Sequence, residues 1–119
     1  MEKLLIVDDS EEIRNQLKWG LSKEYTVLLA GDGKEACALV KKHHPKVVVL
    51  DLGLPPHEAG TAEGYRCLKE ILKDLPYAKV VVITGNDSRD SALKAIQTGA
   101  YDFYQKPIAL EEFKVILSR

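Results

Sequence analysis

Five polar residues of this chain could combine into one reactive site. They are three acids, a hydroxyl and an amine, each at the end of a short apolar segment: Asp8, Asp9, Asp51, Thr84 and Lys106. Three carboxylates in one crevice would repel one another and raise at least one pKa unless a cation joined them. Lys106 supplies one positive charge and a divalent ion two, which would balance the three acids. All-oxygen ligation by few protein groups suits Mg²⁺.

Asp51 is the best candidate nucleophile because it stands alone at the end of a central apolar segment, Val47–Leu50. A carboxylate beside Mg²⁺, a hydroxyl and a lysine is a plausible phosphoryl acceptor, since attack on phosphorus needs mainly positioning and charge neutralisation. Asp8 and Asp9 would then hold the metal. Taken alone, an acid pair at a strand end is more often a solvated turn or a helix cap, and only the whole set favours a metal site.

These residues need a fold that brings distant strand ends together. Short apolar runs predict five strands: Lys3–Val7, Tyr25–Ala30, Val47–Leu50, Val80–Ile83 and about Asp102–Tyr104. Apolar residues at helical spacing predict five intervening helices: one capped by Ser10 with Ile13, Leu17 and Leu21 inward, one after Gly33 with Ala36, Leu39 and Val40, then Tyr65–Leu72, Ser88–Thr98 with Leu93 and Ile96 inward, and one from about Leu110. Strict alternation implies a parallel sheet covered on both faces, with ligands bound outside the carboxyl ends of its strands.

Composition limits the function classes. The 119 residues suit one domain, and 45% hydrophobic with 29% charged residues excludes a disordered tail. No apolar run approaches the ~20 residues needed to span a bilayer, and no leader pattern opens the chain, so we expect a cytoplasmic protein without membrane contact. A net charge of −1 argues against direct nucleic-acid binding. Cys37 and Cys67 lack metal-ligand spacing and are expected to be reduced core residues, and Trp19 is expected to pack inside.

Asp8-Asp9, Asp51, Thr84 and Lys106-Pro107, in that order and spacing, resemble the receiver domain of bacterial two-component response regulators. The resemblance covers the whole chain. It implies a doubly wound α/β fold, CheY-like and flavodoxin-like, with five parallel strands in the order 2-1-3-4-5 and five helices.

The resemblance also implies roles for the acids. Asp51 would accept a phosphoryl group from a sensor histidine kinase, while Asp8 and Asp9 would bind Mg²⁺, or Mn²⁺ in its place, together with Asp51 and the backbone carbonyl of Gly53. We expect a switch that assists its own phosphoryl transfer and hydrolysis, not an enzyme acting on other molecules.

A second group of residues matches the conformational switch of that family. Thr84 would hydrogen-bond the phosphoryl oxygen, Lys106 would pair with it, and Phe103 stands at the switch aromatic position. The Lys106–Pro107 bond matches one that is typically cis. The fourth helix, fifth strand and fifth helix would form a surface for homodimerisation or for contact with an output domain.

Finer similarity links the chain to one subgroup. Segments 51–56, 84–87 and 100–107 resemble receivers of regulators associated with PEP-CTERM/exosortase systems, in which a sigma-54-interacting AAA+ module and a helix-turn-helix follow. The last predicted helix runs into Arg119 without a stop signal, so we expect residues 1–119 to be the front of a longer transcription regulator.

Two departures and two alternatives stay open. The stretch from Asp51 to Gly64 is longer than the usual loop of the family, and Phe103 replaces a tyrosine. A haloacid-dehalogenase-type phosphatase also uses a strand-end aspartate with Mg²⁺, but it needs an acid two positions later, where this chain has Gly53. A phosphorylation-independent adaptor usually lacks one acid or the lysine.

Overall fold

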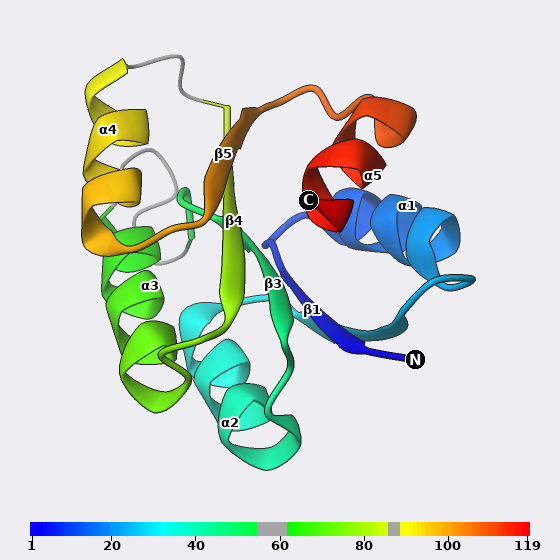
Figure 1. Ribbon diagram of the computed structural model, residues 1–119, viewed down its shortest axis with the longest axis horizontal. Coiled ribbons are helices and arrows are strands. Elements are labelled where there is room, and N and C mark those ends of the chain that lie inside the picture. Colours follow the sequence, from blue (N-terminus) through cyan, green and yellow to red (C-terminus); the bar gives the residue numbers. More distant parts are fainter. Residues whose placement is uncertain (55–61, 86–88) are drawn as a thin grey trace.

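The computed structural model describes residues 1–54, 62–85 and 89–119. Its centre is one parallel sheet in the order β2-β1-β3-β4-β5 (Figure 1). The strands are β1 Lys3–Val7, β2 Thr26–Ala30, β3 Val47–Asp51, β4 Lys79–Thr84 and β5 Asp102–Gln105. The predicted strands and their order are confirmed. The runs of Val, Leu and Ile suit β1, β3 and β4 because these inner strands are covered on both faces.

Five helices connect the strands: α1 Glu11–Leu21, α2 Gly33–His43, α3 Ala62–Asp74, α4 Arg89–Thr98 and α5 Leu110–Ser118. The hydroxyl of Ser10 accepts a hydrogen bond from the Ile13 N–H at 3.2 Å, so Ser10 caps α1 as predicted. Asp32 caps α2 in the same way through the Glu35 N–H. These caps begin each helix directly beyond the carboxyl end of a strand.

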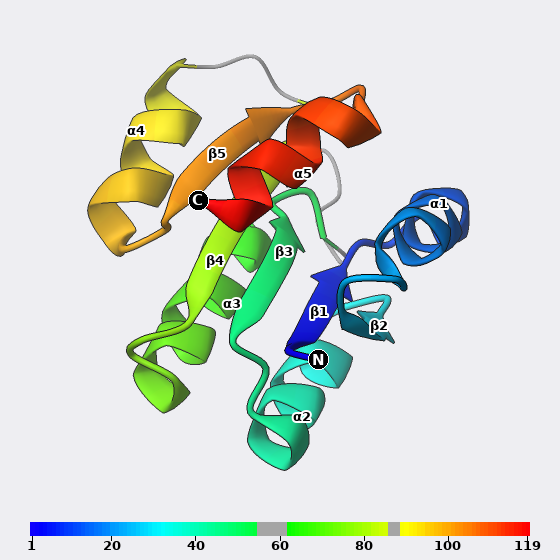
Figure 2. The ribbon, with the colours of Figure 1, turned by 45° about the vertical axis from the view of Figure 1, so that its right-hand side comes forward.

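The helices form two layers around the sheet. α1 and α5 cover one face, whereas α2, α3 and α4 cover the other (Figures 1 and 2). Each layer has its own buried cluster, one including Leu17, Leu21 and Phe113, the other including Val40, Leu68 and Ile71. The sheet is therefore buried on both faces, while its carboxyl edge is left for polar side chains.

Three large apolar side chains lie outward, against expectation. On α4, Leu93 is 53% exposed and Ile96 is 45% exposed, and the fully buried residue there is Ala95. Trp19 on α1 is 84% exposed. The prediction of inward side chains at these positions was wrong, because helical spacing shows that apolar residues share a stripe but not which stripe a sheet covers.

No helix among the described residues is long and apolar enough to cross a membrane. Both cysteines are free: Cys67 is buried and Cys37 partly so. The predicted start of the fourth helix at Ser88, and most of the long segment after Asp51, lie outside the described residues.

Candidate functional site

Strand register brings the predicted polar residues to one edge of the sheet. Val7 pairs with Leu50, so Asp8 and Asp51, which follow them, lie at the same level. Asp51 itself pairs with Ile83, which places Thr84 one residue beyond. The Lys106 N–H donates to the Thr84 carbonyl at 2.9 Å, which holds Lys106 at this level too.

The three acids form one cluster. Asp8, Asp9 and Asp51 each offer a carboxylate oxygen within 4.8 Å of the others. Asp8 and Asp51 are buried, whereas Asp9 is exposed. The Ser10 N–H donates to Asp8 Oδ1 at 2.9 Å, and the Gly53 N–H donates to Asp51 Oδ1 at 3.0 Å. Loop backbone therefore fixes one oxygen of each buried acid and leaves the other oxygen for a different partner.

Lys106 lies between the two remaining oxygens. Its Nζ is 3.3 Å from Asp8 Oδ2 and 3.3 Å from Asp51 Oδ2, and it donates a hydrogen bond to Asp51. Asp8 Oδ2 is fully buried and makes no hydrogen bond within the described part of the chain. A buried carboxylate oxygen left in this state is a ready ligand for a cation.

Electrostatics point the same way. Burial raises the pKa of Asp8 above its ordinary value, and the nearby charge of Asp51 raises it further, against the Ser10 N–H and Lys106. Burial tends to lower the pKa of Lys106, but the charges of Asp51 and Asp8 outweigh it and raise that pKa overall. Lys106 therefore stays protonated and offsets one of three acids. The excess negative charge suits a divalent cation.

The remaining predicted residues lie on β4, on β5 and in the segments that follow β3 and β5. Thr84 is buried at the end of β4, and Phe103 is half-buried on β5 beside Val82. The Lys106–Pro107 peptide bond is cis. Gly53 contributes its N–H to Asp51, as described above.

Two supporting side chains were not predicted. Arg14 Nη1 donates to the backbone carbonyl of Asp8 at 2.6 Å, which ties α1 to the loop that carries Asp8 and Asp9. The Tyr104 hydroxyl accepts from the Ala109 N–H at 3.1 Å, and its ring meets Phe113 edge-on at 5.2 Å. Sequence reasoning missed Arg14 because it lies on a helix, and it missed the role of the Tyr104 hydroxyl because Tyr104 was taken only as part of the fifth strand. The one available signal was the helical position of Arg14, one turn past the Ser10 cap.

Comparison with known proteins agrees with this geometry. The family model for the response regulator receiver domain matches residues 4–118. Response regulator MprA of Mycolicibacterium vanbaalenii is 38% identical over 111 residues, which are 92% of this chain and 46% of that protein. The chain thus spans about half the length of such relatives.

Solved structures give the same result. The beryllofluoride-activated NtrC4 receiver domain dimer has a TM-score of 0.88 at 36% identity, covering 99% of this chain and 94% of that one. A Burkholderia pseudomallei response regulator, solved with a phosphorylated aspartic acid, calcium ion and citrate, has a TM-score of 0.88 at 26% identity, covering 98% and 66%. With its fold, strand-end acids and matched residues 4–118, this chain belongs to the response regulator receiver domain family.

Proposed function

We propose that this chain is a phosphorylation-controlled switch in which Asp51 accepts a phosphoryl group from a sensor histidine kinase. The observation that carries the proposal is the position of Lys106, whose Nζ lies 3.3 Å from both Asp51 Oδ2 and Asp8 Oδ2. This places a permanent positive charge beside a buried carboxylate that also faces two further acids. Such an arrangement suits an acceptor whose product gains negative charge.

The transfer itself needs little covalent chemistry from the protein. A carboxylate oxygen of Asp51 would attack phosphorus, the bond from phosphorus to the histidine nitrogen would break, and that nitrogen would keep the electron pair. Lys106 would neutralise one phosphoryl oxygen and Thr84 would donate a hydrogen bond to another. Attack by water on the acyl phosphate would later restore the Asp51 carboxylate.

The donor set fits a hard divalent cation. Asp8, Asp9 and Asp51 would hold Mg²⁺, with Mn²⁺ as a substitute, and the Gly53 carbonyl would be a fourth protein ligand. Asp8 Oδ2, which accepts no hydrogen bond from any described residue, supports this assignment. When bound, the ion would neutralise the charge that develops on the transferring group.

Phosphorylation would act on the surface formed by α4, β5 and α5. Thr84 and Lys106 would move toward the phosphoryl oxygens, and the half-buried Phe103 would turn inward, which biases an equilibrium between two conformations. Exposed apolar side chains on this surface give a partner something to bury: Leu93, Ile96, Tyr101 and Val115. A second copy of the chain is the proposed partner, in line with the beryllofluoride-activated NtrC4 receiver domain, which is a dimer.

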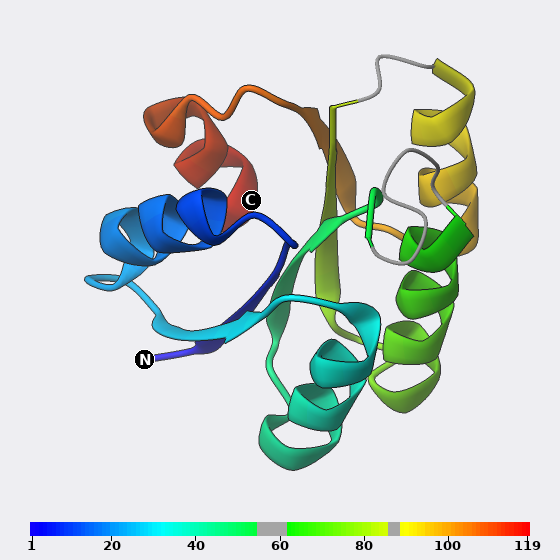
Figure 3. The ribbon, with the colours of Figure 1, turned by 180° about the vertical axis from the view of Figure 1, so that it is seen from behind.

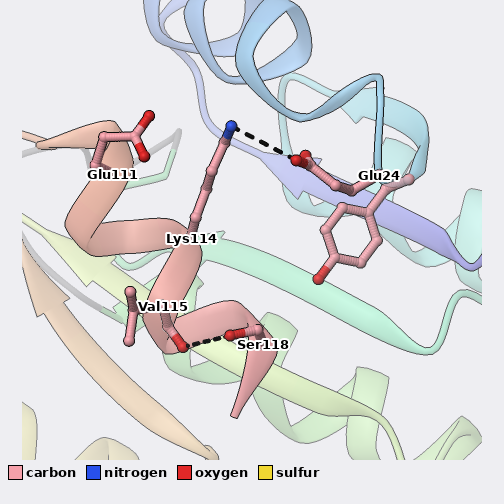
Figure 4. A pocket seen from close by; sticks show the side chains of 6 residues that line it. Glu24, Glu111, Lys114, Val115 and Ser118 are labelled. Carbon is pink, nitrogen blue, oxygen red and sulfur yellow. Dashed lines mark hydrogen bonds and ion pairs between the residues drawn. The ribbon is translucent and has the colours of Figure 1, made fainter.

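Several charges of this surface already have partners within the chain. Arg119 Nη2 lies 2.7 Å from Asp102 Oδ2, and Lys114 Nζ lies 3.6 Å from Glu24 Oε1. A surface cavity of about 270 Å³ lies between α5 and the segment before β2. The Lys114–Glu24 pair joins two of the residues that line it (Figure 4). The dimer would therefore rely on its apolar side chains more than on new ion pairs.

We further propose that residues 1–119 form the front of a longer cytoplasmic transcription regulator. MprA of Mycolicibacterium vanbaalenii is about twice as long as this chain, and the putative NtrX-like response regulator of Rickettsia conorii, of which the match covers 24%, is longer still, which supports a following output module. The sequence similarity to PEP-CTERM-associated regulators suggests an AAA+ module with a helix-turn-helix, and this stays a prediction. The receiver itself would make no direct contact with nucleic acid.

The decisive experiment is intact mass spectrometry after incubation with Mg²⁺ and acetyl phosphate. We expect one phosphoryl adduct on the natural chain that needs the metal and hydrolyses with time. The Asp51→Asn variant should show none, whereas Asp102→Asn, matched in chemistry but remote from the cluster, should react normally. An adduct on Asp51→Asn would identify a different nucleophile. No adduct on any chain, with Mg²⁺ binding shown separately, would favour the phosphorylation-independent adaptor.

A further inference from the structure

The two free cysteines lie on two helices that contact each other, and neither belongs to the acidic cluster. Cys37 lies on α2 and Cys67 on α3, and these helices pack side by side on the same face of the sheet (Figure 3). Cys67 belongs to the buried core cluster of that face, and Cys37 packs against the same cluster. The register of the two helices sets these residues at the same level: an added Cβ at Gly33 of α2 would lie 2.9 Å from a carboxylate oxygen of Glu63 on α3, and Cys37 and Cys67 each follow about one turn later.

Access from solvent differs between the two thiols. Cys37 lines a surface groove of about 570 Å³ between α2 and α3, together with basic side chains that include Lys34, Lys41 and Arg66. Cys67 is completely buried and does not line this groove. A reagent in the groove therefore meets Cys37 first, and Cys67 can be reached only through Cys37.

We propose that Cys37 and Cys67 are a redox-modification site, which closes to a disulfide linking α2 to α3 when a low-molecular-weight disulfide enters through Cys37. This site is independent of the phosphoryl acceptor. It leaves the thiols free under reducing conditions and adds a covalent link under oxidising ones.

The chemistry is two successive thiol–disulfide exchanges. The Cys37 thiolate attacks one sulfur of the small disulfide, whose S–S bond breaks and releases one thiolate. The Cys67 thiolate then attacks Cys37 Sγ in the mixed disulfide and releases the second thiolate. The two protein thiols lose two electrons and two protons, and the small disulfide gains them as two thiols. A small thiol in excess reverses both steps.

The reaction should be slow near neutral pH. Burial raises the pKa of the Cys37 thiol, and it raises the pKa of Cys67 to about 12. Since the thiolate is the attacking form, the rate should rise roughly tenfold per pH unit while pH stays below these values. This makes the site responsive to a sustained oxidising shift rather than to a brief one.

The test uses oxidised glutathione on the 119-residue chain, quenched with acid and analysed by intact mass. The natural chain should lose two hydrogens, with little mixed disulfide remaining, and should regain them with reduced glutathione. Cys67→Ala should stop at the adduct of one glutathionyl group. Cys37→Ser should stay unmodified, because Cys67 is buried.

Two results would overturn the proposal. One is Cys37→Ser reacting as fast as the natural chain. The other is a natural chain that accumulates the mixed disulfide without closing, although a thermal melt shows the fold intact. Because truncation of buried Cys67 could loosen the core, Cys67→Ser is tested beside Cys67→Ala, and both must give the same adduct. The phosphoryl-adduct assay is run in parallel under reducing conditions, so failure of one proposal is distinguishable from failure of the other.

Discussion

Asp8 is a carboxylate held completely out of water at the end of β1. Its Oδ1 accepts from the Ser10 N–H, while its Oδ2 makes no hydrogen bond with any described residue. An ionised oxygen in that position costs stability unless a cation compensates it. Lys106 Nζ, 3.3 Å away, compensates it only in part, since burial and the charge of Asp51 still raise the pKa of Asp8. The position of Asp8 therefore lowers the stability of the metal-free fold and increases the affinity of the site for a cation.

Removing the charge of Asp8 should stabilise the metal-free chain. The pKa of Asp8 is higher in the folded chain than its ordinary value of 3.8. Between these two pKa values the folded chain therefore holds a proton on Asp8 that the unfolded chain has lost. Stability is lost across that window, and above it the penalty is complete. We expect Asp8→Asn to raise the free energy of unfolding at pH 7 by about 1 kcal/mol, or Tm by ~4 °C.

Thermal melts in a chelator would measure this effect. The exposed neighbour gives the matched control, because Asp9→Asn should leave the metal-free Tm nearly unchanged. The advantage of Asp8→Asn should shrink as pH falls toward the ordinary carboxyl range, where Asp8 becomes protonated in the natural chain as well. A lower Tm for Asp8→Asn at pH 7 would contradict the burial argument.

At the residue scale, the sequence was sufficient to select the acids and Lys106, because side chains after parallel strands must meet at one edge. It could not supply the contact of Arg14 with the Asp8 carbonyl. The distance between these two residues depends on the orientation of α1 relative to the loop. The spacing of apolar residues in the sequence does not predict that orientation.

At the element scale, α3 approaches β3 unusually closely at Gly64. A Cβ added there would overlap the backbone of Leu52, directly after β3. Because the obstacle is backbone rather than a flexible side chain, the helix would have to move. We expect Gly64→Ala to lower the free energy of unfolding by about 2 kcal/mol.

Urea unfolding of Gly64→Ala would measure this, with Gly85→Ala as the matched control. An added Cβ at Gly85 has no described atom within 4 Å, and its backbone conformation is open to other residues. Its stability should change by less than about 0.5 kcal/mol. Equal losses in the two variants would show that glycine flexibility, and not the close approach, is what matters.

Elements with strong apolar runs could be predicted closely, and so could the inward faces of α1 and α2, but the inward face of α4 could not. The spacing of Leu93 and Ile96 marks a genuine stripe on α4, yet that stripe faces outward and Ala95 faces the sheet. A small residue lets α4 sit against its neighbours, and the larger side chains remain available. This inversion is itself a reason to assign a partner to α4.

That assignment gives a prediction about self-association. In the phosphorylated chain, Leu93→Asp should weaken the dimer at least about tenfold, because it places a charge in an interface that buries apolar surface. The chain carries a matched control in Trp19→Asp, since Trp19 is more exposed but lies on α1. Analytical ultracentrifugation would compare the dimer dissociation constants of the two variants, each activated with beryllofluoride in place of the phosphoryl group. Loss of the dimer in Trp19→Asp alone would move the interface to α1.

At the scale of the whole molecule, the acidic cluster joins the two halves of the sheet. Asp8 extends β1 and Asp51 ends β3, while Lys106 follows β5 at the far edge. The helix layers lie on opposite faces of this sheet (Figures 1 and 2). An ion held at its carboxyl edge would contact segments that follow the neighbouring strands β1 and β3, which both layers cover, so its binding energy would be coupled to global folding.

Mg²⁺ should consequently stabilise the entire domain, not the loops alone. At a free concentration of about 100 times the dissociation constant, linkage gives about 2.7 kcal/mol of added stability. The rise in Tm should follow the logarithm of Mg²⁺ concentration in the natural chain. It should largely vanish in Asp9→Ala, which removes a ligand without disturbing the core. Asp74→Ala, at the opposite end of the sheet on α3, should keep the full rise. If Asp74→Ala lost it as well, general screening of acidic charge would explain the effect, and the cluster of Asp8, Asp9 and Asp51 would no longer be needed to account for it.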